Sequence, residues 1–322
     1  MENLSKQEIK LQSLIKSDEQ LKKAEKIQRV TKVLYKILTY AFLLLVAVII
    51  VFPFYWMIIS SLKTQTEYYF SPPTFVPGYH EVVLDGEVAR RWGWGNIDWK
   101  NYIESMKEAD FSRYMINTVI VGLVSTVLSM FVTIFAAFAF SRLKFKGRET
   151  LFSILLATMM IPGEMFTVTN YTTVSALGWK NTYIVLIVPF LVSVFYIYLL
   201  RQNFKQIPDS LYYAAKVDGT SDMKYLFKVM IPLASPTIIS IIIMKMMGAW
   251  NSYLWPRLVA DEDSFRLITN GLREAFTVEP GQQMDYPLQM AAVTIVSIPL
   301  FLVFAFFRKY IMRGVARTGT KG

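Results

Sequence analysis

The segment IPDSLYYAAKVDGTSDMKYLFKVMIP, residues 207–232, is polar although strongly apolar runs flank it on both sides. Its Asp-Ser pair at 209–210 favours the start of a helix, and Gly219 stands where a helix would end in a left-handed turn. Residues 220–222 are suited to begin a second short helix, which Pro232 would end. The pattern predicts two short helices joined at a glycine, a structure suited to docking a soluble partner. The alternative, from these residues alone, is an ordinary loop. We call this segment the elbow.

Composition places the chain among membrane proteins. Of its 322 residues, 54% are hydrophobic and 18% are charged, which is apolar for a soluble domain. A net charge of +10 could indicate a nucleic-acid partner, but the charges flank apolar runs instead of forming a stripe. The chain has no cysteine, which excludes disulfides and thiolate sites, and only one histidine, His80, which excludes sites that need two. We therefore expect no nucleic-acid partner and no metal site.

Six apolar runs are long enough to cross a bilayer, which predicts an all-α integral membrane protein with six transmembrane helices. Pro53 lies inside the first run, and Pro162-Gly163 interrupts the third. The six runs are 37–62, 115–140, 151–168, 183–200, 236–254 and 287–307.

The segments outside these runs have their own patterns. Residues 1–36 form a basic tail that is expected to lie as a helix on the membrane surface. Residues 63–114 are expected to form an external loop. Within it, positions 80–91 alternate in polarity and turn at Asp85-Gly86, which is typical of a β-hairpin. A second external segment covers residues 256–286.

Aromatic residues near the predicted hairpin have two interpretations. They could contact sugar rings brought by a delivery protein, or they could form an interfacial belt at the membrane surface. These residues are Trp92, Trp94, Trp99 and Tyr102.

Charges between the spans predict the orientation of the chain. With both termini in the cytoplasm, the inner segments carry 23 Lys and Arg residues against 9 acids, and the outer segments carry 10 against 14. Because cytoplasmic loops are enriched in basic residues, this orientation is favoured. It places the elbow and the basic tail at 311–322 in the cytoplasm.

The elbow also carries a pattern of residues at fixed spacing. Tyr213-Ala214-Ala215 is followed by Gly219 and then by the Val-Met-Ile-Pro run at 229–232. This order resembles the Glu-Ala-Ala…Gly…Ile-x-Leu-Pro loop of ABC importer membrane subunits, and Asp218 before the glycine is common in the sugar-importing branch. The chain resembles the second membrane subunit of maltose-type carbohydrate importers over residues 115–310 and the first span.

The resemblance implies a role for the elbow. In that family the coupling helices, here residues 209–230, fit a cleft on a separate ATP-hydrolysing subunit. Tyr213 stands where the family has a glutamate, which three residues after Ser210 would close a capping box, so we expect packing there instead of an ionic contact. The expected coupling residues are Ser210, Tyr213, Ala214, Ala215, Asp218, Gly219 and Pro232.

The sequence carries no phosphate-binding loop of its own. Its nearest candidate, at 314–321, has lysine and threonine in the wrong order and no preceding strand. No Ser/His/Asp set can form beyond the single histidine, so no catalytic residue is expected. The resemblance implies that the partner ATPase binds ATP and Mg²⁺ and that this chain binds no cofactor.

Two ionisable residues, Glu164 and Lys245, fall inside predicted spans at similar depth. Charges within a membrane usually face a cavity or each other. Three interpretations stay open. The two residues pair across the third and fifth spans, or Lys245 lines the pathway and meets an acidic sugar such as a uronate. In the third, they snorkel or contact a partner subunit.

The run WNSYLWP at 250–256 ends the fifth span. Aromatic faces stack on sugar rings, and asparagine can both donate to and accept from hydroxyls. Similar WN…LWP runs recur in the sugar-importer branch. Trp250 and Asn251, and after them Tyr253 and Trp255, are therefore candidate pathway residues, and an interfacial belt is the alternative.

The resemblance as a whole implies a permease subunit of a binding-protein-dependent ABC importer for carbohydrates, with oligosaccharides and acidic sugars as candidate substrates. Its implied partners are a sister permease, two ATP-binding subunits, an external sugar-binding protein and the lipid of the bacterial cytoplasmic membrane. An ABC importer for another solute is one alternative. The others are an ion-coupled secondary transporter that works through Glu164 and Lys245, and a membrane scaffold with no pathway.

Overall fold

The chain divides into two units, Met1–Ile59 and Ser60–Gly322. The first unit consists of most of helix α1 (Glu2–Ser61), which contains Pro53. From Gln28 onward this helix is long and apolar enough to cross a membrane, as predicted for residues 37–62. The computed structural model describes the backbone of residues 2–84, 87–108, 110–277 and 283–316, and the side chains of residues 28–83, 88–107, 110–277 and 283–309.

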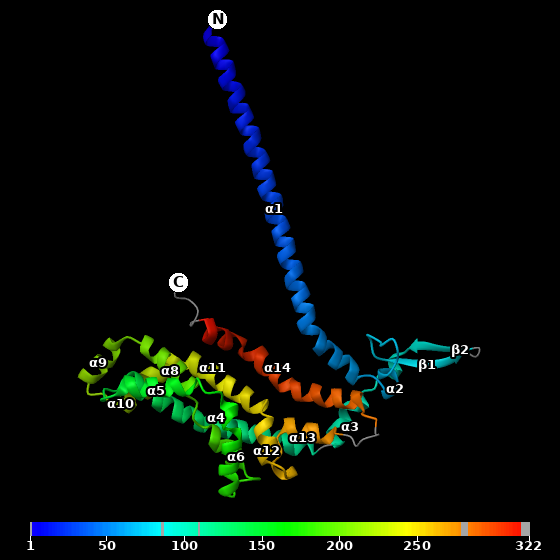
Figure 1. Ribbon diagram of the computed structural model, residues 1–322, viewed down its shortest axis with the longest axis vertical. Coiled ribbons are helices and arrows are strands. Elements are labelled where there is room, and N and C mark those ends of the chain that lie inside the picture. Colours follow the sequence, from blue (N-terminus) through cyan, green and yellow to red (C-terminus); the bar gives the residue numbers. More distant parts are fainter. Residues whose placement is uncertain (1, 85–86, 109, 278–282, 317–322) are drawn as a thin grey trace. The chain divides into compact units, whose positions relative to one another are not determined.

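The second unit contains long helices with shorter ones at both ends (Figure 1). Helices α9 and α10 lie at one end of this unit, and α3 and α13 lie at the other. The longer helices are α4 (Phe111–Ser141), α5 (Arg148–Thr158), α6 (Thr167–Ala176), α8 (Val194–Gln206), α11 (Ile231–Trp250) and α14 (Tyr286–Ala316). The shorter ones are α2 (Gln65–Tyr68), α3 (Lys100–Glu108), α7 (Tyr183–Ile187), α9 (Asp209–Val217), α10 (Asp222–Tyr225), α12 (Leu254–Val259) and α13 (Ile268–Ala275).

Helix α4 packs against α8 and α11 with a face of small residues. Such residues let transmembrane helices approach closely, because little side-chain volume separates their backbones. The four-residue spacing keeps them on one side of the helix. The buried small residues at this spacing are Ser125, Ser129, Thr133, Ala137 and Ser141. This face therefore allows α4 to occupy the interior of the helix group.

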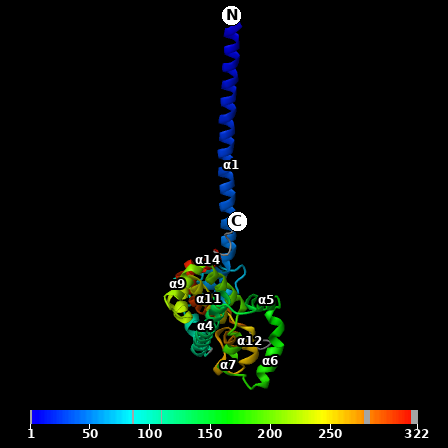
Figure 2. The same cartoon turned by 90° about the vertical axis from the view of Figure 1, so that its left-hand side faces the viewer.

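Two of the predicted spans are broken. Helices α5 and α6 meet at an angle of 83° across residues 159–162, and Figure 2 shows them as separate helices at a corner. Pro162-Gly163 had predicted this break. The span predicted at 183–200 also contains a bend, which its sequence did not indicate. The segment Tyr183–Phe190 is bent by 46° from α8, because Ser193 begins a new helix by accepting the Tyr196 amide (3.4 Å).

The second elbow helix does not stop at Pro232, contrary to the sequence prediction. Helix α10 continues through a π-helical turn, Leu226–Met230, into α11. Pro232 lies in the first turn of α11, where the missing amide hydrogen costs little, and the wider π turn precedes it. One continuous helix therefore runs from Asp222 to Trp250.

Strands β1 (Tyr79–Leu84) and β2 (Glu87–Trp92) pair antiparallel, with Tyr79 opposite Trp92. They occupy the range in which the sequence predicted a hairpin, and its expected turn at Asp85-Gly86 lies outside the described residues. We call residues 62–107, which include these strands, α2 and most of α3, the hairpin module.

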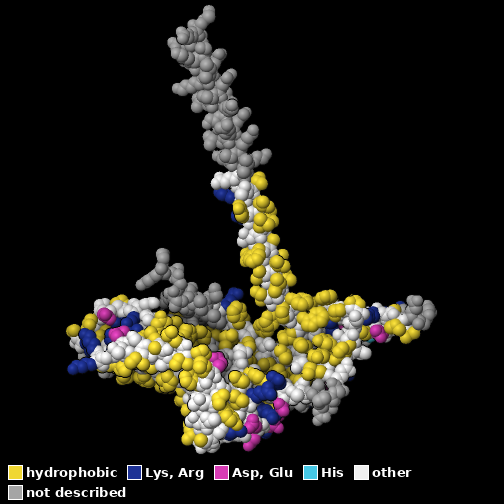
Figure 3. All heavy atoms as spheres, viewed as in Figure 1, with side chains coloured by type: hydrophobic (Ala, Val, Ile, Leu, Met, Phe, Trp, Pro, Cys, Tyr) yellow, Lys and Arg dark blue, Asp and Glu magenta, His cyan; other side chains and the backbone are white. Residues whose placement is uncertain are grey.

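Hydrophobic and charged side chains occupy different parts of the surface of the second unit. On the face shown in Figure 3, its middle is largely hydrophobic, and charged side chains gather over α9 and α10 and around α12 and α13. Four helices in the described part of the chain are long and apolar enough to cross a membrane, and six spans result if each bent pair counts as one. This count agrees with the predicted all-α membrane fold.

Gly271 of α13 provides a test of the packing between α13 and α4. A β-carbon at Gly271 would lie 2.3 Å from the buried Tyr114 ring, whereas one at Gly248 of α11 would meet nothing within 4 Å. Gly271→Ala should destabilise the protein by about 1–3 kcal/mol through overpacking and lower the detergent-solubilised melting temperature by several degrees. Gly248→Ala, the matched control, should not lower it. Equal melting temperatures for the two variants would contradict this packing.

Candidate functional site

The elbow folds as two helices around Gly219, as predicted. Gly219 has a φ of +69°, the left-handed conformation that glycine adopts at least cost. The Thr220 amide then donates to the Ala215 carbonyl (2.9 Å), which closes the end of α9. Ser221 accepts the Lys224 amide (3.3 Å) and so caps α10.

The start of the first elbow helix differs from the prediction. Asp209 is already helical, and Pro208 occupies the cap position without a side-chain hydrogen bond. Ser210 therefore does not cap the helix, and residue 213 does not stand where a capping box would need a glutamate. Tyr213 instead presents its ring about half exposed, with the Lys144 ammonium 5.7 Å from the ring centre.

One side of the elbow is exposed and apolar, and the other side is packed. Val217 is 88% exposed and Tyr213 is 52% exposed. Tyr212 and Ala215 face the opposite way and pack on the core cluster that contains the fully buried Tyr225. Further exposed members are Leu211 and Met223, and Ser210, Ala214, Asp218 and Gly219 are exposed beside them. The elbow thus presents a small apolar surface at the end of the unit, on a rigid base.

A polar contact joins the two elbow helices across Gly219. Asp222 accepts hydrogen bonds from Lys216 (2.9 Å) and from the Tyr212 hydroxyl (2.8 Å). The hydrogen bond to the Asp222 carboxylate raises the pKa of Lys216 above its usual value. The contact restrains the angle between α9 and α10.

A buried arginine fixes the elbow to the end of α4. The Arg142 side chain is 3% exposed. Its guanidinium donates to the Phe204 carbonyl (2.7 Å) and to the Ile207 carbonyl, and it pairs with Asp209. These three acceptors lie at the end of α8 and at the start of α9, so one side chain holds the junction between α4, α8 and the elbow.

A second buried arginine, Arg201 of α8, reinforces the same end of the helix group. It donates to the Phe140 carbonyl (3.0 Å) and to Glu149 of α5 (2.6 Å), and its guanidinium lies 3.8 Å from the centre of the Phe152 ring. The sequence predicted Arg142 and Arg201 only as basic residues of loops, because nothing in the local pattern indicates that they are buried.

The helix group also forms a partly open cavity of about 370 Å³. It combines hydroxyl groups, aromatic rings and one cation, and it lies between α4, α11, α12 and the break before α8. Its lining includes Ser125, Phe190, Ser193, Tyr196, Lys245, Gly248, Ser252 and Trp255. Cavities of this size and mixed lining are common ligand sites.

Lys245 lines this cavity, and it does not pair with Glu164. Its ammonium donates to the Phe190 carbonyl (2.7 Å), which the break between residues 190 and 194 leaves outside a helical hydrogen bond. Glu164 lies exposed on the 3-10 turn Gly163–Phe166, and among the described residues it takes part in no ion pair. Of the three interpretations, pairing is therefore wrong for this structure.

The WNSYLWP run contributes differently from the prediction. Trp250 is buried against α14, where its indole N–H donates to the Val296 carbonyl (3.2 Å), so its ring does not line the cavity. Asn251 donates to the Met247 carbonyl (2.9 Å) outside the cavity. Tyr253 accepts hydrogen bonds from Arg257 and Arg273. Of the four candidates in this run, Trp255 lines the cavity, fixed by a bond from its indole N–H to the Val185 carbonyl (2.9 Å).

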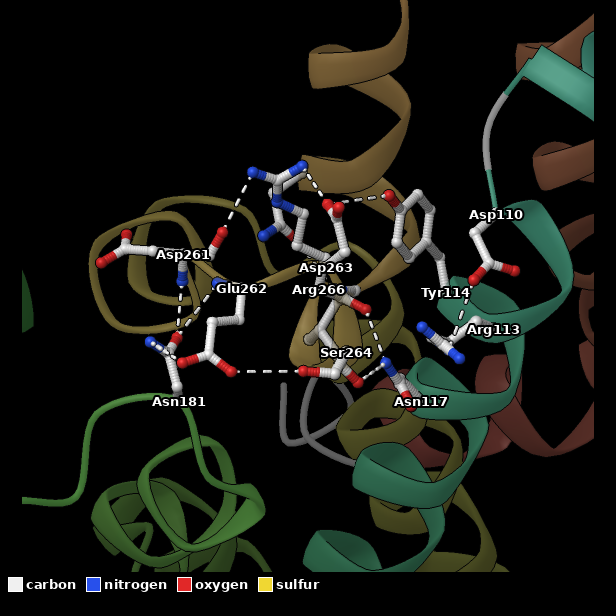
Figure 4. Close-up of polar contacts among 12 residues, drawn as sticks. Asp110, Arg113, Tyr114, Asn117, Asn181, Asp261, Glu262, Asp263, Ser264 and Arg266 are labelled. Atoms are coloured by element: carbon white, nitrogen blue, oxygen red, sulfur yellow. Dashed lines mark hydrogen bonds and ion pairs between the residues drawn. The ribbon is translucent and has the colours of Figure 1, made fainter.

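Two asparagines hold the segment between α12 and α13 in place (Figure 4). Asn181, with a φ of +53°, accepts the amides of Asp261 (2.7 Å) and Glu262 (3.2 Å). Asn117 of α4 donates to the carbonyls of Ser264 (2.9 Å) and Arg266 (3.0 Å). This segment, part of the second predicted external region, is therefore anchored to the helix group at two points.

Comparison with known proteins identifies the family. Residues 129–317 match the binding-protein-dependent transport system inner membrane component. The chain belongs to this family. It is 27% identical to the lactose transport system permease protein LacG of Rhizobium radiobacter over 87% of this chain and 94% of that protein. It is 28% identical to the polygalacturonan/rhamnogalacturonan transport system permease protein YtcP of Bacillus subtilis over 90% and 99%.

A solved structure has the same fold. It is a chain of a bacterial ABC transporter involved in the import of the acidic polysaccharide alginate, with a TM-score of 0.74 and 21% identity. The match covers 86% of this chain and 96% of that chain. The family membership and the fold establish a multi-pass membrane component of a binding-protein-dependent transport system.

Replacing Arg142 tests whether it holds the elbow. Arg142→Met should leave the carbonyls of Phe204 and Ile207 without their donor, at a cost of about 1–3 kcal/mol for each buried group. We expect the amides of residues 207–225 to exchange hydrogen at least tenfold faster in the purified protein. Lys146→Met is the matched control, because it removes an exposed cation from the same short linker. Exchange at the wild-type rate in Arg142→Met would contradict the anchoring role.

Proposed function

We propose that this chain is a permease subunit of an ATP-driven ABC importer for oligosaccharides in the bacterial cytoplasmic membrane. It would form the translocation pathway with a sister permease. Two ATP-binding subunits would dock at the elbow from the cytoplasm, and an external binding protein would deliver the substrate. The observation that carries the proposal is the elbow itself, a rigid, anchored pair of helices with an exposed apolar face.

Physical arguments support the docking role. An exposed surface around Val217 and Tyr213 is unusual for a polar segment between membrane helices, and apolar and aromatic side chains of this kind dominate the energy of protein interfaces. The basic residues near the elbow support a cytoplasmic location by the positive-inside rule.

The contacts of the elbow provide a route by which movement of the ATP-binding subunits would reach the helix group. Movement of the ATP-binding subunits would push on α9, and Arg142 would pass the displacement to α4 and α8. The second elbow helix continues into α11, whose far part carries Lys245. Opening and closing of the cavity would therefore accompany movement of the elbow, as alternating access requires.

The proposed substrate class rests on the relatives and on the cavity. The matched permeases serve lactose and polygalacturonan/rhamnogalacturonan transport, and the similar fold comes from an alginate importer. The cavity offers the hydroxyls of Ser125 and Tyr196, the ring of Trp255 and the ammonium of Lys245. Hydroxyls and an aromatic face suit sugars, and the ammonium suits the carboxylate of an acidic sugar.

Val217→Asp tests docking at the elbow. Because the Val217 side chain is 88% exposed, the change should leave folding intact while placing a charge in the apolar interface. We expect ATP-driven uptake by the reconstituted importer, and recovery of the ATP-binding subunits with this chain, to fall at least tenfold.

Leu177→Asp is the control for that test. It makes the same kind of change at a 56% exposed position after α6, away from the elbow, and it should retain both activities. Equal uptake and equal recovery of the ATP-binding subunits in the two variants would contradict docking at the elbow. Uptake that needs no ATP and stops when the ion gradient collapses would instead indicate a secondary transporter.

Lys245→Met tests the charge in the cavity. Loss of a charged hydrogen bond costs about 1.5–3 kcal/mol, so uptake of pentagalacturonate should weaken by about 10–100-fold in apparent affinity. Uptake of neutral maltopentaose should change less than threefold, and Lys245→Arg should retain most of the acidic uptake. A parallel loss for both sugars would show that Lys245 acts only through its bond to Phe190.

A further inference from the structure

The hairpin module is organised around a buried carboxylate. The Glu67 side chain has no exposed surface, and it accepts hydrogen bonds from the Thr74 hydroxyl (2.9 Å) and the Gly78 amide (2.9 Å). The Lys63 ammonium donates to the Thr74 carbonyl (2.6 Å) nearby. A buried charge is tolerated only where such partners are fixed, so this part of the module has a defined shape.

Further bonds join the start, middle and end of the module. Asn101 of α3 donates to the carbonyls of Ser61 (3.0 Å) and Lys63 (2.8 Å). The Trp92 indole N–H donates to the Pro77 carbonyl (3.0 Å), beside the positive-φ Gly78. The module is therefore a preorganised structure instead of a loose connection between helices.

This structure carries a cleft of about 670 Å³ that the transport role above does not use. Three aromatic side chains, Phe70, Tyr79 and Trp99, contribute to its walls, and Trp99 is 64% exposed. Polar side chains lie among them, including Glu81 and Asn96. The amide nitrogen of Asn96 is 2.7 Å from His80 Nδ1, which fixes the orientation of the amide group. The volume lies within the range of small-molecule sites.

The side chains that line the cleft indicate what kind of ligand it would bind. Aromatic rings cover the C–H faces of a sugar ring, and carboxylate and amide groups bond its hydroxyls. Glu81 and Asp98 outnumber Lys100 among the charged groups that line the cleft. This excess of negative charge disfavours a carboxylate-bearing sugar, and it distinguishes the cleft from the Lys245 cavity.

An interfacial belt explains the cleft less well. A tryptophan that only anchors the chain at a membrane surface needs apolar surroundings on one side. Trp99 instead shares its cleft with Glu81, Asp98 and Lys100, whose charges favour water. Trp94, by contrast, is 77% exposed, does not line the cleft and packs on Trp92 with ring centres 4.9 Å apart.

We propose that the cleft of the hairpin module binds a pyranose unit of a neutral oligosaccharide on the external side of the membrane. Trp99 stacks on the sugar ring, and Glu81 and Asn96 bond its hydroxyls. The external placement rests on the proposed function. The site would hold an oligosaccharide at the outer face of the importer, apart from the cavity within the helix group.

Binding of maltopentaose to the purified importer in nanodiscs, without binding protein or ATP, tests this proposal. Trp99→Ala should weaken binding at least tenfold, since stacking of a ring on an aromatic side chain is lost, while Trp94→Ala should stay within twofold of the wild type. Glu81→Gln keeps the shape of an exposed side chain and should weaken binding several-fold. This second variant keeps the test valid if Trp99→Ala does not fold.

Three outcomes would overturn the proposal, and a fourth would refute only the proposed transport function. Unchanged maltopentaose binding in both Trp99→Ala and Glu81→Gln would indicate an interfacial role, and weaker capture of the binding protein with unchanged sugar binding would indicate a protein-docking surface. Tighter binding of pentagalacturonate than of maltopentaose at this cleft would contradict the neutral ligand. Saccharide binding that survives while ATP-driven uptake is absent would instead refute the proposed transport function and leave this site standing.

Discussion

The structure of the candidate site depends on one buried guanidinium. Arg142 lies at the end of α4, where its donors satisfy the carbonyls at the end of α8 and pair with the first acid of α9. Without that group, two buried backbone acceptors would lack partners, and Asp209 in the first turn of α9 would lose its cation. The exposed apolar face can therefore be presented at a fixed angle because the opposite side of the elbow is tied down.

Inside the helix group, a charged side chain again donates to a backbone carbonyl that has no helical partner. The break before α8 leaves the Phe190 carbonyl available, and Lys245 reaches it from α11. An intramembrane lysine thus has a structural partner and still lines a cavity, which makes its charge tolerable in the absence of a ligand. Trp255 is held in a comparable way through its bond to Val185, so the wall of the cavity comes from positions that the fold itself fixes.

The long apolar runs, together with the positions of proline and glycine, predicted much of this architecture. The helical class, the break at Pro162-Gly163 and the left-handed Gly219 followed from local rules, because each depends on a few neighbouring residues. The break before α8 and the continuation of the helix through Pro232 were not predicted, because a cap residue at Ser193 lies inside an apolar run and a π turn before a proline has no sequence signature.

The site was less accessible to sequence analysis. Glu164 and Lys245 were expected at similar depth, yet their separation depends on how a broken helix turns away, which composition does not encode. Trp250 and Trp255 occupy similar local contexts, and only the neighbouring helices decide which one enters the cavity. The burial of Arg142 likewise followed from a partner 60 or more positions away in the chain.

The π-helical turn at Leu226–Met230 has a geometric consequence for this molecule. It joins α10 to α11 in one rod from Asp222 to Trp250, about 43 Å long at the rise of an α-helix. Because successive residues of an α-helix are rotated by about 100°, removing a single residue from the π turn would swing everything beyond it around the helix axis by roughly that angle. The ammonium of Lys245 would then point away from its chamber while the elbow kept its own shape. The π turn thus sets the direction in which the Lys245 side chain points relative to the elbow.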